Sequence, residues 1–544
     1  MKASDLLVRC LEKEKVEYIF GLPGEENIDV MESLLDSSIR FIGVRHEQGA
    51  AFMADVYGRL TGKAGVCLST LGPGATNLMT GVADANMDGS PVVAITGQAS
   101  LDRMHKESHQ HIDVVDTFQP ITKWNAQITK AAIIPEIVRK AFKVAETEKP
   151  GATHIDLPED VAEEEVDAEP LLPQAPYPWE PPAAQIDRAA ALITAAKSPI
   201  ILAGNGVVRR HASEALTRFA ERLNIPVAET FMGKGVLRDD HPLSLLTCGL
   251  QARDYVSCGF DRADVVIAVG YDLVEYSPER WNPERDKTII HIDMLPAEVD
   301  QHYTVGVGVL GDISTTLHRI AERAEPCRTD DYTQGLRAFI LHERDEFRAD
   351  TSFPMKPQRV LNDLRTVMDS GDILVSDVGA HKMWIARLFP CYRPNTCIIS
   401  NGFAAMGIGV PGALAAKLVH PRQNVVAVTG DGGFLMNSQE LETAVREEVP
   451  FVTLIFHDDS YSLIGMKQER RFGRTSHIRF GNPDLVKYAE SFGVAGYRVG
   501  AADELQPILR DAFACGRPSV VDCPVDYTEN LRMMERLGAL ICPI

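Results

Sequence analysis

The sequence has few of the features that mark membrane, secreted or zinc-binding proteins. No apolar run approaches the roughly 20 residues that span a bilayer, and the opening MKASDLLVRCLEKEKVEYIF lacks the apolar centre of a signal peptide. None of the 10 cysteines forms a CxxC pair, so we expect reduced thiols rather than zinc sites or disulfides. These absences favour a cytoplasmic protein with no membrane partner.

Positive charge is also in short supply. The chain carries 55 lysines and arginines against 76 aspartates and glutamates, a net charge of −21, which argues against nucleic acid as a partner. Its 544 residues are enough for three or four domains at about 150 residues each. The composition therefore indicates a globular protein of several domains.

Strand-like and helix-like stretches alternate in three blocks, residues 1–165, 185–325 and 356–530. A proline-rich, acidic linker separates the first two blocks, and a polar link near 326–355 separates the last two. This alternation predicts an α/β protein with three doubly wound parallel-sheet domains. The strands that we expect lie at 18–20, 41–45, 65–70, 92–96, 200–202, 226–228, 265–269, 288–292, 425–428 and 451–456.

The most informative stretch is GDGGFLMNSQELETAVREEVPFVTLIFHDDSY, which begins at Gly430. One apolar run ends at its GDG and a second ends at its HDD, so two adjacent parallel strands would bring Asp431 and Asp458 to one carboxyl edge. Two carboxylates beside glycines and a helix N-terminus suit a hard divalent cation and the phosphates that it bridges. The GDG sequence alone and the HDD sequence alone are each common in simple turns, so the prediction of a metal site depends on finding both at this spacing.

A second candidate lies in the first block, in RHEQGAAFMADVYGR from Arg45. Glu47 falls where a strand should give way to a helix rich in small residues. A carboxyl group there is suited to donate and accept a proton near neutral pH. The structural alternative is a glutamate that stabilises a helix N-terminus, and the residues alone leave both open.

Together these motifs resemble the thiamine-diphosphate decarboxylase and synthase superfamily, and within it the acetolactate synthases. GLPGEEN, STLGPGATN, ITGQ, SDVGAHKMW and NGFAAMGIGVPGA complete the resemblance, in the family's order and over nearly the whole chain. YAESFG and PVDYTEN resemble the catabolic, flavin-independent type. The resemblance implies a pyrimidine-binding domain at 1–165, a central domain at 185–325 and a pyrophosphate-binding domain at 356–530.

The resemblance also implies a ligand set. Asp431, the side chain of Asp458 and the backbone carbonyl of Ser460 would bind Mg²⁺, and N–H groups at the glycines and at a helix beginning near Asn437 would face the phosphates. His457 departs from the family asparagine and is expected to be a supporting or packing residue. The implied cofactor-binding residues are Gly21, Pro23, Gly24, Gly72, Gly379, His381, Ala404, Met406, Gly430, Asp431, Gly432, Gly433, Asp458, Ser460 and Tyr461.

The implied chemistry assigns roles to a few further groups. Met406 would be the bulky side chain beneath the cofactor, and the backbones of Ala404 and Met406 would hold the pyrimidine. The two catalytic residues would be Glu47, which exchanges a proton with the pyrimidine ring, and Gln98, which lines the substrate pocket. The expected reaction decarboxylates pyruvate on thiamine diphosphate. It then joins the hydroxyethyl carbanion to a second pyruvate, giving 2-acetolactate and CO₂.

Several alternatives stay open. The chain could be another thiamine-diphosphate enzyme, namely a pyruvate oxidase, an aryl 2-oxoacid decarboxylase or an acetyltransferase. A non-enzymatic paralogue is disfavoured by the intact acidic residues, and a dehydrogenase by the lack of a GxGxxG unit with its acidic partner.

The resemblance carries expectations about FAD, the acceptor and assembly. The flavin-associated sequence of biosynthetic forms is replaced by GYDLVEYSPERWN at 270–282, so we expect no FAD. Lys467 stands where those forms have a tryptophan that favours 2-oxobutyrate. We expect a homodimer or a homotetramer built from dimers, with each site formed between two subunits.

Overall fold

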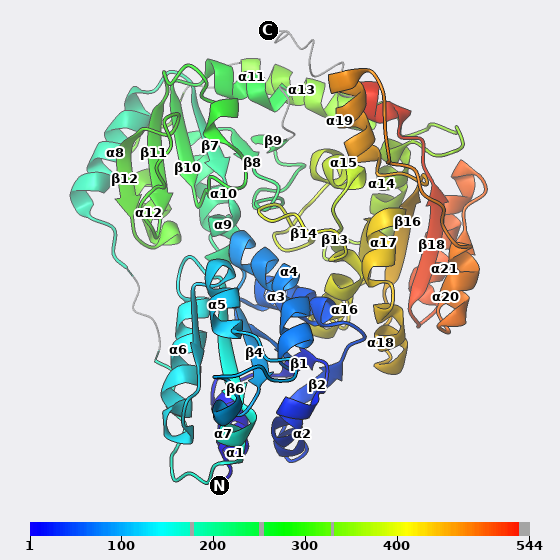
Figure 1. The fold of residues 1–544 in the computed structure, drawn as a ribbon. Coiled ribbons are helices and arrows are strands. Elements are labelled where there is room, and N and C mark those ends of the chain that lie inside the picture. The colour runs from blue at the N-terminus through cyan, green and yellow to red at the C-terminus, as the bar shows by residue number, and fades with distance from the viewer. Residues whose placement is uncertain (175–178, 250–254, 328–330, 533–544) are drawn as a thin grey trace.

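The computed structural model describes residues 1–174, 179–249, 255–327 and 331–532, which fold around three six-stranded sheets (Figure 1). Neighbouring strands within each sheet run parallel. Helices cover the sheets, so the predicted α/β fold with three parallel sheets is confirmed. Among the described helices, none is both long and apolar enough to cross a membrane.

The first sheet has the order β2-β1-β3-β4-β6-β5. Its order reverses between β1 and β3, so the loops after these two strands flank a crevice at the carboxyl edge. Its strands are β1 (Tyr18–Gly21), β2 (Arg40–Gly43), β3 (Gly65–Ser69), β4 (Val92–Gln98), β5 (Trp124–Gln127) and β6 (Ala152–Pro158). Its helices are α1 (Ala3–Lys13), α2 (Ile28–Leu34), α3 (Glu47–Thr61), α4 (Gly72–Asp88), α5 (Val114–Phe118), α6 (Ile134–Glu146) and α7 (Glu159–Glu163).

The central sheet has the order β12-β11-β10-β7-β8-β9 and reverses between β7 and β10. Its strands are β7 (Pro199–Ala203), β8 (Val227–Glu229), β9 (Ser244–Thr247), β10 (Val265–Val269), β11 (Thr288–Asp293) and β12 (Val305–Leu310). The helices of this part are α8 (Ala183–Ala195), α9 (Asn205–Arg209), α10 (Ser213–Leu223), α11 (Tyr255–Arg262), α12 (Ile313–Ala321) and α13 (Asp331–Asp345).

The third sheet has the order β14-β13-β15-β16-β18-β17 and reverses between β13 and β15. Its strands are β13 (Ile373–Ser376), β14 (Cys397–Ile399), β15 (Val425–Gly430), β16 (Val452–His457), β17 (Ala495–Arg498) and β18 (Ser519–Pro524). Its helices are α14 (Pro357–Val367), α15 (Ala380–Leu388), α16 (Gly409–Val419), α17 (Asp431–Asn437), α18 (Glu440–Arg446), α19 (Ser462–Phe472), α20 (Leu485–Ser491) and α21 (Leu505–Ala514).

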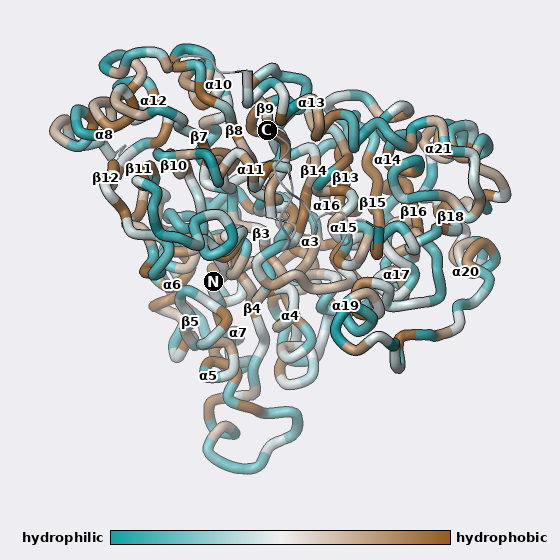
Figure 2. Tube along the Cα trace, turned by 90° about the horizontal axis from the view of Figure 1, so that it is seen from above, coloured by the Kyte–Doolittle hydropathy of each residue, from teal (hydrophilic) through white to brown (hydrophobic). Residues whose placement is uncertain are grey.

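The first and third sheets share a hydrophobic core. Helix α3 packs against α16, and the buried side chains of Phe52 and Val56 belong to one cluster with Ile408 and Leu414. Gly412 permits this approach, because a Cβ there would lie only 3.0 Å from Cγ2 of Val56. Apolar residues concentrate in strands and inner helices, while outer loops are hydrophilic (Figure 2). The two cofactor motifs therefore lie on parts of the chain that pack together.

Three local expectations need correction. The helix expected near Asn437 begins at Asp431, directly after β15, and ends at Asn437. Strands β5, β6, β9, β12, β13, β14, β17 and β18 were not expected, because they are short, half-buried or merged with polar neighbours. Eight of the described cysteines form no disulfide, but Cys258 is in a disulfide, so the prediction of reduced thiols is wrong there.

Candidate active site at two carboxyl edges

Strands β15 and β16 end side by side at one edge of the third sheet. Gly430, the last residue of β15, pairs in register with Phe456, one residue before β16 ends at His457. Asp431 and Asp458 therefore follow the two strand ends at the same edge, as the apolar runs predicted. The order of this sheet reverses between β13 and β15, so this edge is the place where an α/β fold binds its ligand.

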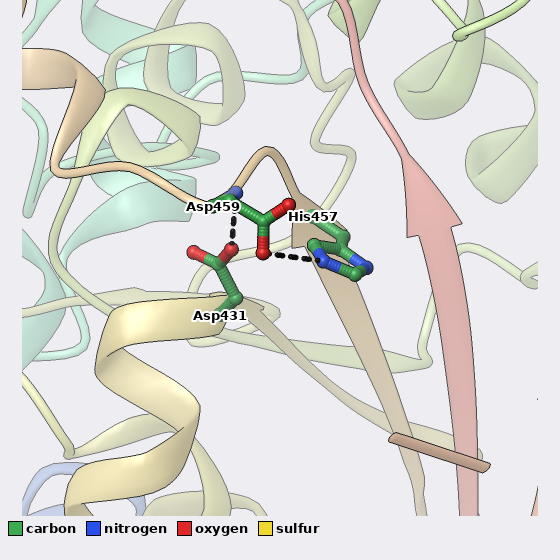
Figure 3. Close-up of side chains that lie close together, drawn as sticks. All are labelled: Asp431, His457 and Asp459. Atoms are coloured by element: carbon green, nitrogen blue, oxygen red, sulfur yellow. Dashed lines mark hydrogen bonds and ion pairs between the residues drawn. The ribbon is translucent and has the colours of Figure 1, made fainter. Parts of the chain in front are cut away.

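Asp431 is buried at the first position of α17 and is held by several N–H groups. Its Oδ2 accepts the backbone N–H of Asp459 (2.7 Å) and the side-chain amide of Asn482 (2.8 Å), and its Oδ1 accepts the N–H of Gly432 (2.8 Å). The side chains of Asp431, His457 and Asp459 converge (Figure 3), with one ligand atom of each lying within 4.8 Å of the others.

His457 closes this cluster rather than offering a lone pair to a metal. Its Nδ1 bonds to Oδ1 of Asp522 (2.7 Å) and its Nε2 to Oδ1 of Asp459 (3.2 Å). The hydrogen bond to Asp522 is the main cause that raises the pKa of His457 to about 9. Because both ring nitrogens are engaged by carboxylates, the imidazole supports the acidic edge, in line with the supporting role expected for it.

Asp458 lies beside a serine at the start of the following helix. Its carboxylate accepts the hydroxyl of Ser462, at the start of α19. Burial, together with the nearby charge of Asp431, raises the pKa of Asp458 to about 7. The side-chain amide oxygen of Asn482, Oδ1, is buried and has no hydrogen-bond partner among the described residues. Two neighbouring carboxylates repel each other unless a cation lies between them. Asp431 and Asp458, beside the unpaired amide oxygen of Asn482, therefore fit a hard divalent cation such as Mg²⁺.

Unpaired donors lie next to the acidic edge. The ring of His381 is buried against Gly379 and Gly430, where added Cβ atoms would lie 2.8 and 3.4 Å from it, and its Nε2 has no partner among the described residues. Burial lowers the pKa of His381 to about 4, so the ring is neutral. The hydroxyl of Tyr527 is also buried and unpaired within the described chain, and burial raises its pKa. Such donors fit a diphosphate.

A cavity opens beside these groups. It has a volume of about 650 Å³ and lies between α19 and the segment that follows β18, which is the size of a small-molecule site. Asp458, Ser460 and Tyr527 line it. The Tyr461 ring packs on Phe480 with centroids 4.8 Å apart, and Gly432 lies so close to that ring that a Cβ there would be 2.8 Å from Cε1.

Glu47 begins α3 and is buried. Its Oε2 accepts the side-chain amide of Asn77 on α4 (2.9 Å). The helix N-terminus is capped instead by the ring of His46, which accepts the N–H of Gln48 (3.1 Å). The Glu47 carboxyl is therefore not used as the cap, which leaves the proton-transfer role open to it. A Cβ at Gly74 would lie 3.4 Å from its Oε1, so the STLGPG loop borders this group.

The other predicted residues of the first block have packing reasons for their identity. Gly21 ends β1 against the carbonyl of Leu68, Gly24 lies against Thr70, and Gly72 has a φ of +43°. Pro23 lies in the same loop as Gly21 and Gly24. These loops follow β1 and β3, at the crevice where the order of the first sheet reverses.

Gln98 is held by its own protein. Its Nε2 donates to Asp156 (3.3 Å), while its Oε1 accepts the N–H of Ala99 (2.9 Å) and bonds to Nδ1 of His111 (3.1 Å). The amide is therefore part of a buried network at the end of β4. The structure places the Gln98 side chain within this buried network of the first block and does not bring it to the acidic edge at Asp431.

Residues 399–407, from the last residue of β14 into the connection to α16, are named here the Met406 loop. Ala404 has a left-handed φ of +58° and Gly407 a φ of +96°. Met406 between them is half-buried. The amide of Asn437 donates to the carbonyl of Gly407 (3.0 Å) and also to Oε1 of Gln48 (3.0 Å). The Met406 loop, the end of α17 and the start of α3 therefore lie together.

Sequence reasoning missed Asn77, Asn482, Asp522 and Tyr527. Asn482 reaches Asp431 from 51 positions along the chain, and Asn77 reaches Glu47 from 30 positions. Neither spacing carries a periodic signal. Tyr527 lies in PVDYTEN, just after the buried strand β18 at the carboxyl edge, and that position is a usable signal.

Comparison with protein families agrees with this geometry. Residues 1–117 match the N-terminal TPP binding domain of thiamine pyrophosphate enzymes, residues 186–320 the central domain, and residues 377–523 the C-terminal TPP binding domain. The two halves of the site fall in the two TPP-binding matches. The chain is a thiamine pyrophosphate enzyme.

Curated relatives narrow the family. An acetolactate synthase of Bacillus subtilis is 38% identical over 98% of this chain and 94% of its own length. A catabolic acetolactate synthase of Raoultella terrigena is 38% identical over 98% and 97%. A probable acetolactate synthase large subunit of Methanocaldococcus jannaschii is 39% identical over 100% and 96%. The chain belongs to the acetolactate synthase family.

Proposed function

We propose that the protein condenses two molecules of pyruvate to 2-acetolactate and CO₂, using thiamine diphosphate and Mg²⁺. The observation that carries the proposal is the acidic edge at Asp431 beside the unpaired donors of His381 and Tyr527. An acidic edge alone would fit a cation. The neighbouring donors extend the fit to a diphosphate held by that cation.

Different groups of the chain are proposed to bind the metal ion and the phosphates of the cofactor. Asp431, Asp458 and the carbonyl of Ser460 are proposed to hold Mg²⁺, while Nε2 of His381 and the Tyr527 hydroxyl donate to phosphate oxygens. When bound, thiamine diphosphate supplies a carbon nucleophile and an electron sink for the decarboxylation of a 2-oxoacid.

Glu47 is proposed to move a proton at the pyrimidine ring. Asn77 donates to Oε2 of Glu47 and fixes the side-chain rotamer, which leaves Oε1 beside Gly74 for the ring. Met406 is proposed to pack beneath the cofactor, and Gln98 to line the substrate pocket. We further propose pyruvate as the acceptor, which is supported by Lys467 in place of the family tryptophan.

We propose that the enzyme works without FAD. At the switch point of the central sheet, Glu275 accepts the N–H of Asn205 (3.0 Å) and the hydroxyl of Thr230, and Gly204 lies against the carbonyl of Gly270. The chain's own side chains thus fill the crevice where α/β folds bind dinucleotides. Purified protein should be colourless, whereas a stoichiometric flavin absorption band at about 450 nm would refute the proposal.

The function is tested with cofactor-stripped protein supplied with pyruvate, thiamine diphosphate and Mg²⁺. We expect NMR to identify 2-acetolactate, which gives acetoin after acid decarboxylation, and we expect no turnover in EDTA. Acetaldehyde as the main product would indicate a decarboxylase, and oxygen-dependent formation of acetate or acetyl phosphate would indicate an oxidase. Either result would overturn the proposed carboligation.

A further inference from the structure

Two buried carboxylates hold the peptide groups on either side of Met406. The N–H of Ala405 donates to Oδ1 of Asp84 (3.2 Å), and the N–H of Gly407 donates to Oδ1 of Asp377 (2.9 Å). Asp84 lies on α4 in the first block, whereas Asp377 directly follows β13 in the third. The loop is therefore fixed from two domains at once.

Asp84 is one of several groups near the end of α4 that hold the Met406 loop. The Ser400 hydroxyl donates to the same Oδ1 of Asp84 (2.7 Å), and the N–H of Gly402 donates to Oδ1 of Asp88 (2.5 Å). Arg59 on α3 pairs with Asp88 and donates to the carbonyl of Ile399 (3.0 Å). The Ser400–Asp84 bond is buried and the others are partly buried, so water competes little for these contacts.

Both carboxylate oxygens of Asp377 accept backbone N–H groups, one from the end of the Met406 loop and one from the start of α16. Its Oδ1 accepts the N–H of Gly407, and its Oδ2 accepts the N–H of Gly409 (3.0 Å) at the start of α16. Ala404 and Gly407, one on each flank of Met406, both have left-handed φ values. A left-handed alanine persists only where surrounding contacts hold it. The two aspartates supply such contacts.

We propose that Asp84 and Asp377 are positioning residues that fix the Met406 side chain and the Ala404 backbone for the cofactor's two rings. The inference rests on the proposed function, because that function places Met406 beneath the cofactor. Neither aspartate needs to touch the cofactor. Met406 can set the angle between the cofactor's two rings only if its backbone stays in place, because a small displacement of reacting groups lowers the reaction rate strongly.

We expect the two aspartates to respond differently to substitution by asparagine. Asp84 accepts both hydrogen bonds at Oδ1, and its Oδ2 has only the 3.5 Å ion pair with Arg59. Asp84→Asn therefore keeps the acceptor that the loop uses. Asp377→Asn places an NH₂ group against the N–H of Gly407 or of Gly409. Asp363→Ala is the matched control, because Asp363 is a fully buried aspartate of the same block that pairs with Arg359.

The test begins with hydrogen–deuterium exchange on peptides that cover 399–407, in protein without cofactor. We expect exchange there to be at least about tenfold faster in Asp84→Ala, Asp377→Ala and Asp377→Asn, since buried N–H groups lose their acceptors. We expect Asp84→Asn and Asp363→Ala to match the wild type in this segment. Equal exchange in all variants would overturn the proposal, as would equally faster exchange in the Asp363→Ala control.

The second readout is the affinity for thiamine diphosphate with Mg²⁺, measured by titration calorimetry. We expect Kd to rise about tenfold in the three impaired variants and to stay near the wild-type value in the other two. Unchanged affinity in Asp84→Ala and Asp377→Ala would contradict the inference. If the wild type itself fails to bind, the proposed function fails, but the exchange contrast still tests whether the aspartates hold the loop.

Discussion

At the scale of single residues, the acidic groups of the site are held by different sets of partners. Asp431 accepts backbone and amide N–H groups, Asp458 accepts a serine hydroxyl, and Glu47 accepts an asparagine amide. Backbone N–H groups stay in place when a neighbouring side chain is replaced. Removing one acidic group therefore changes the ligand set while leaving most of the edge intact.

Asp431→Ala should abolish measurable binding of thiamine diphosphate with Mg²⁺. The substitution removes a buried hard ligand, and the diphosphate charge is then poorly neutralised. We expect the Kd measured by calorimetry to rise by at least about a hundredfold, which corresponds to about 2.7 kcal/mol. Asp363→Ala serves as the control for loss of a buried aspartate elsewhere. Retention of wild-type affinity by Asp431→Ala would remove it from the proposed ligand set.

Glu47→Gln should bind the cofactor but activate it poorly. Glutamine keeps an oxygen for the Asn77 amide, so the local packing is preserved, but it does not transfer the proton. General acid–base groups contribute about 10² to 10⁴ in rate, and we expect a loss in this range. The measurement is exchange of the cofactor's C2 proton by quenched NMR, with calorimetry to verify binding. An exchange rate equal to that of the wild type would assign the proton transfer to another group.

At the scale of elements, Glu440 on α18 joins the first and third blocks of one chain. Its buried carboxylate accepts the N–H groups of Arg45 (3.1 Å) and His46 (3.1 Å), which immediately precede α3. It also accepts the Thr443 hydroxyl (2.7 Å). Gly49 lies close by, since a Cβ there would be 2.8 Å from Oε1. The start of α3, and with it Glu47, is therefore held by the third block.

Titration of Glu440 should make the free energy of unfolding depend on pH. Burial raises its pKa from 4.5 to about 7. The folded state thus holds a proton that the unfolded state releases, so its contribution to stability is full below about 4.5 and is lost as the pH rises to about 7. The change is on the order of 3 kcal/mol, at 1.36 kcal/mol for each unit.

Glu440→Gln does not ionise and should lose this slope. Urea unfolding of both proteins at several pH values between about 4.5 and 7 gives the comparison. We expect the difference in stability between wild type and variant to shift steadily across this range. A constant difference would show that the carboxyl group does not titrate with folding. Glu442→Gln, on the more exposed side of α18, is the matched control.

Much of the fold and part of the site followed from local pattern. Continuous apolar runs such as Val265–Val269 predicted strands, and the GDG after one of them placed Asp431 at a carboxyl edge. Strand β5 was missed because all its residues are only half-buried. The contacts of Glu440 with Arg45 and of Asp84 with Ala405 join residues 395 and 321 positions apart. No local preference encodes such pairings, because they arise only when two domains pack.

At the scale of the whole molecule, the packing of the first and third blocks leaves apolar side chains in solvent near the site. A single subunit rarely exposes such side chains together without a partner. They come from the Met406 loop, α17, and α19 with the residue before it, and a second copy of the chain is expected to cover them. The exposed residues are Phe403, Met436, Tyr461, Ile464 and Phe472.

The central prediction is that one thiamine-diphosphate site needs both Glu47 and Asp431, taken from different subunits of a dimer, while the contacts of Glu440 join the first and third blocks within each subunit. Inactive Glu47→Gln chains are mixed with inactive Asp431→Ala chains and allowed to exchange subunits. In a mixed dimer, one site then receives both wild-type residues and the other receives both substitutions. Random exchange makes half of the dimers mixed, so about a quarter of all sites are repaired.

We predict that acetolactate formation from pyruvate recovers to about a quarter of the wild-type rate as mixed dimers accumulate. Each variant alone, treated in the same way, should stay inactive. Sedimentation identifies the dimer, and differently tagged chains verify the exchange. If verified mixed dimers regain no activity, or if an active monomer is found, the shared site is contradicted.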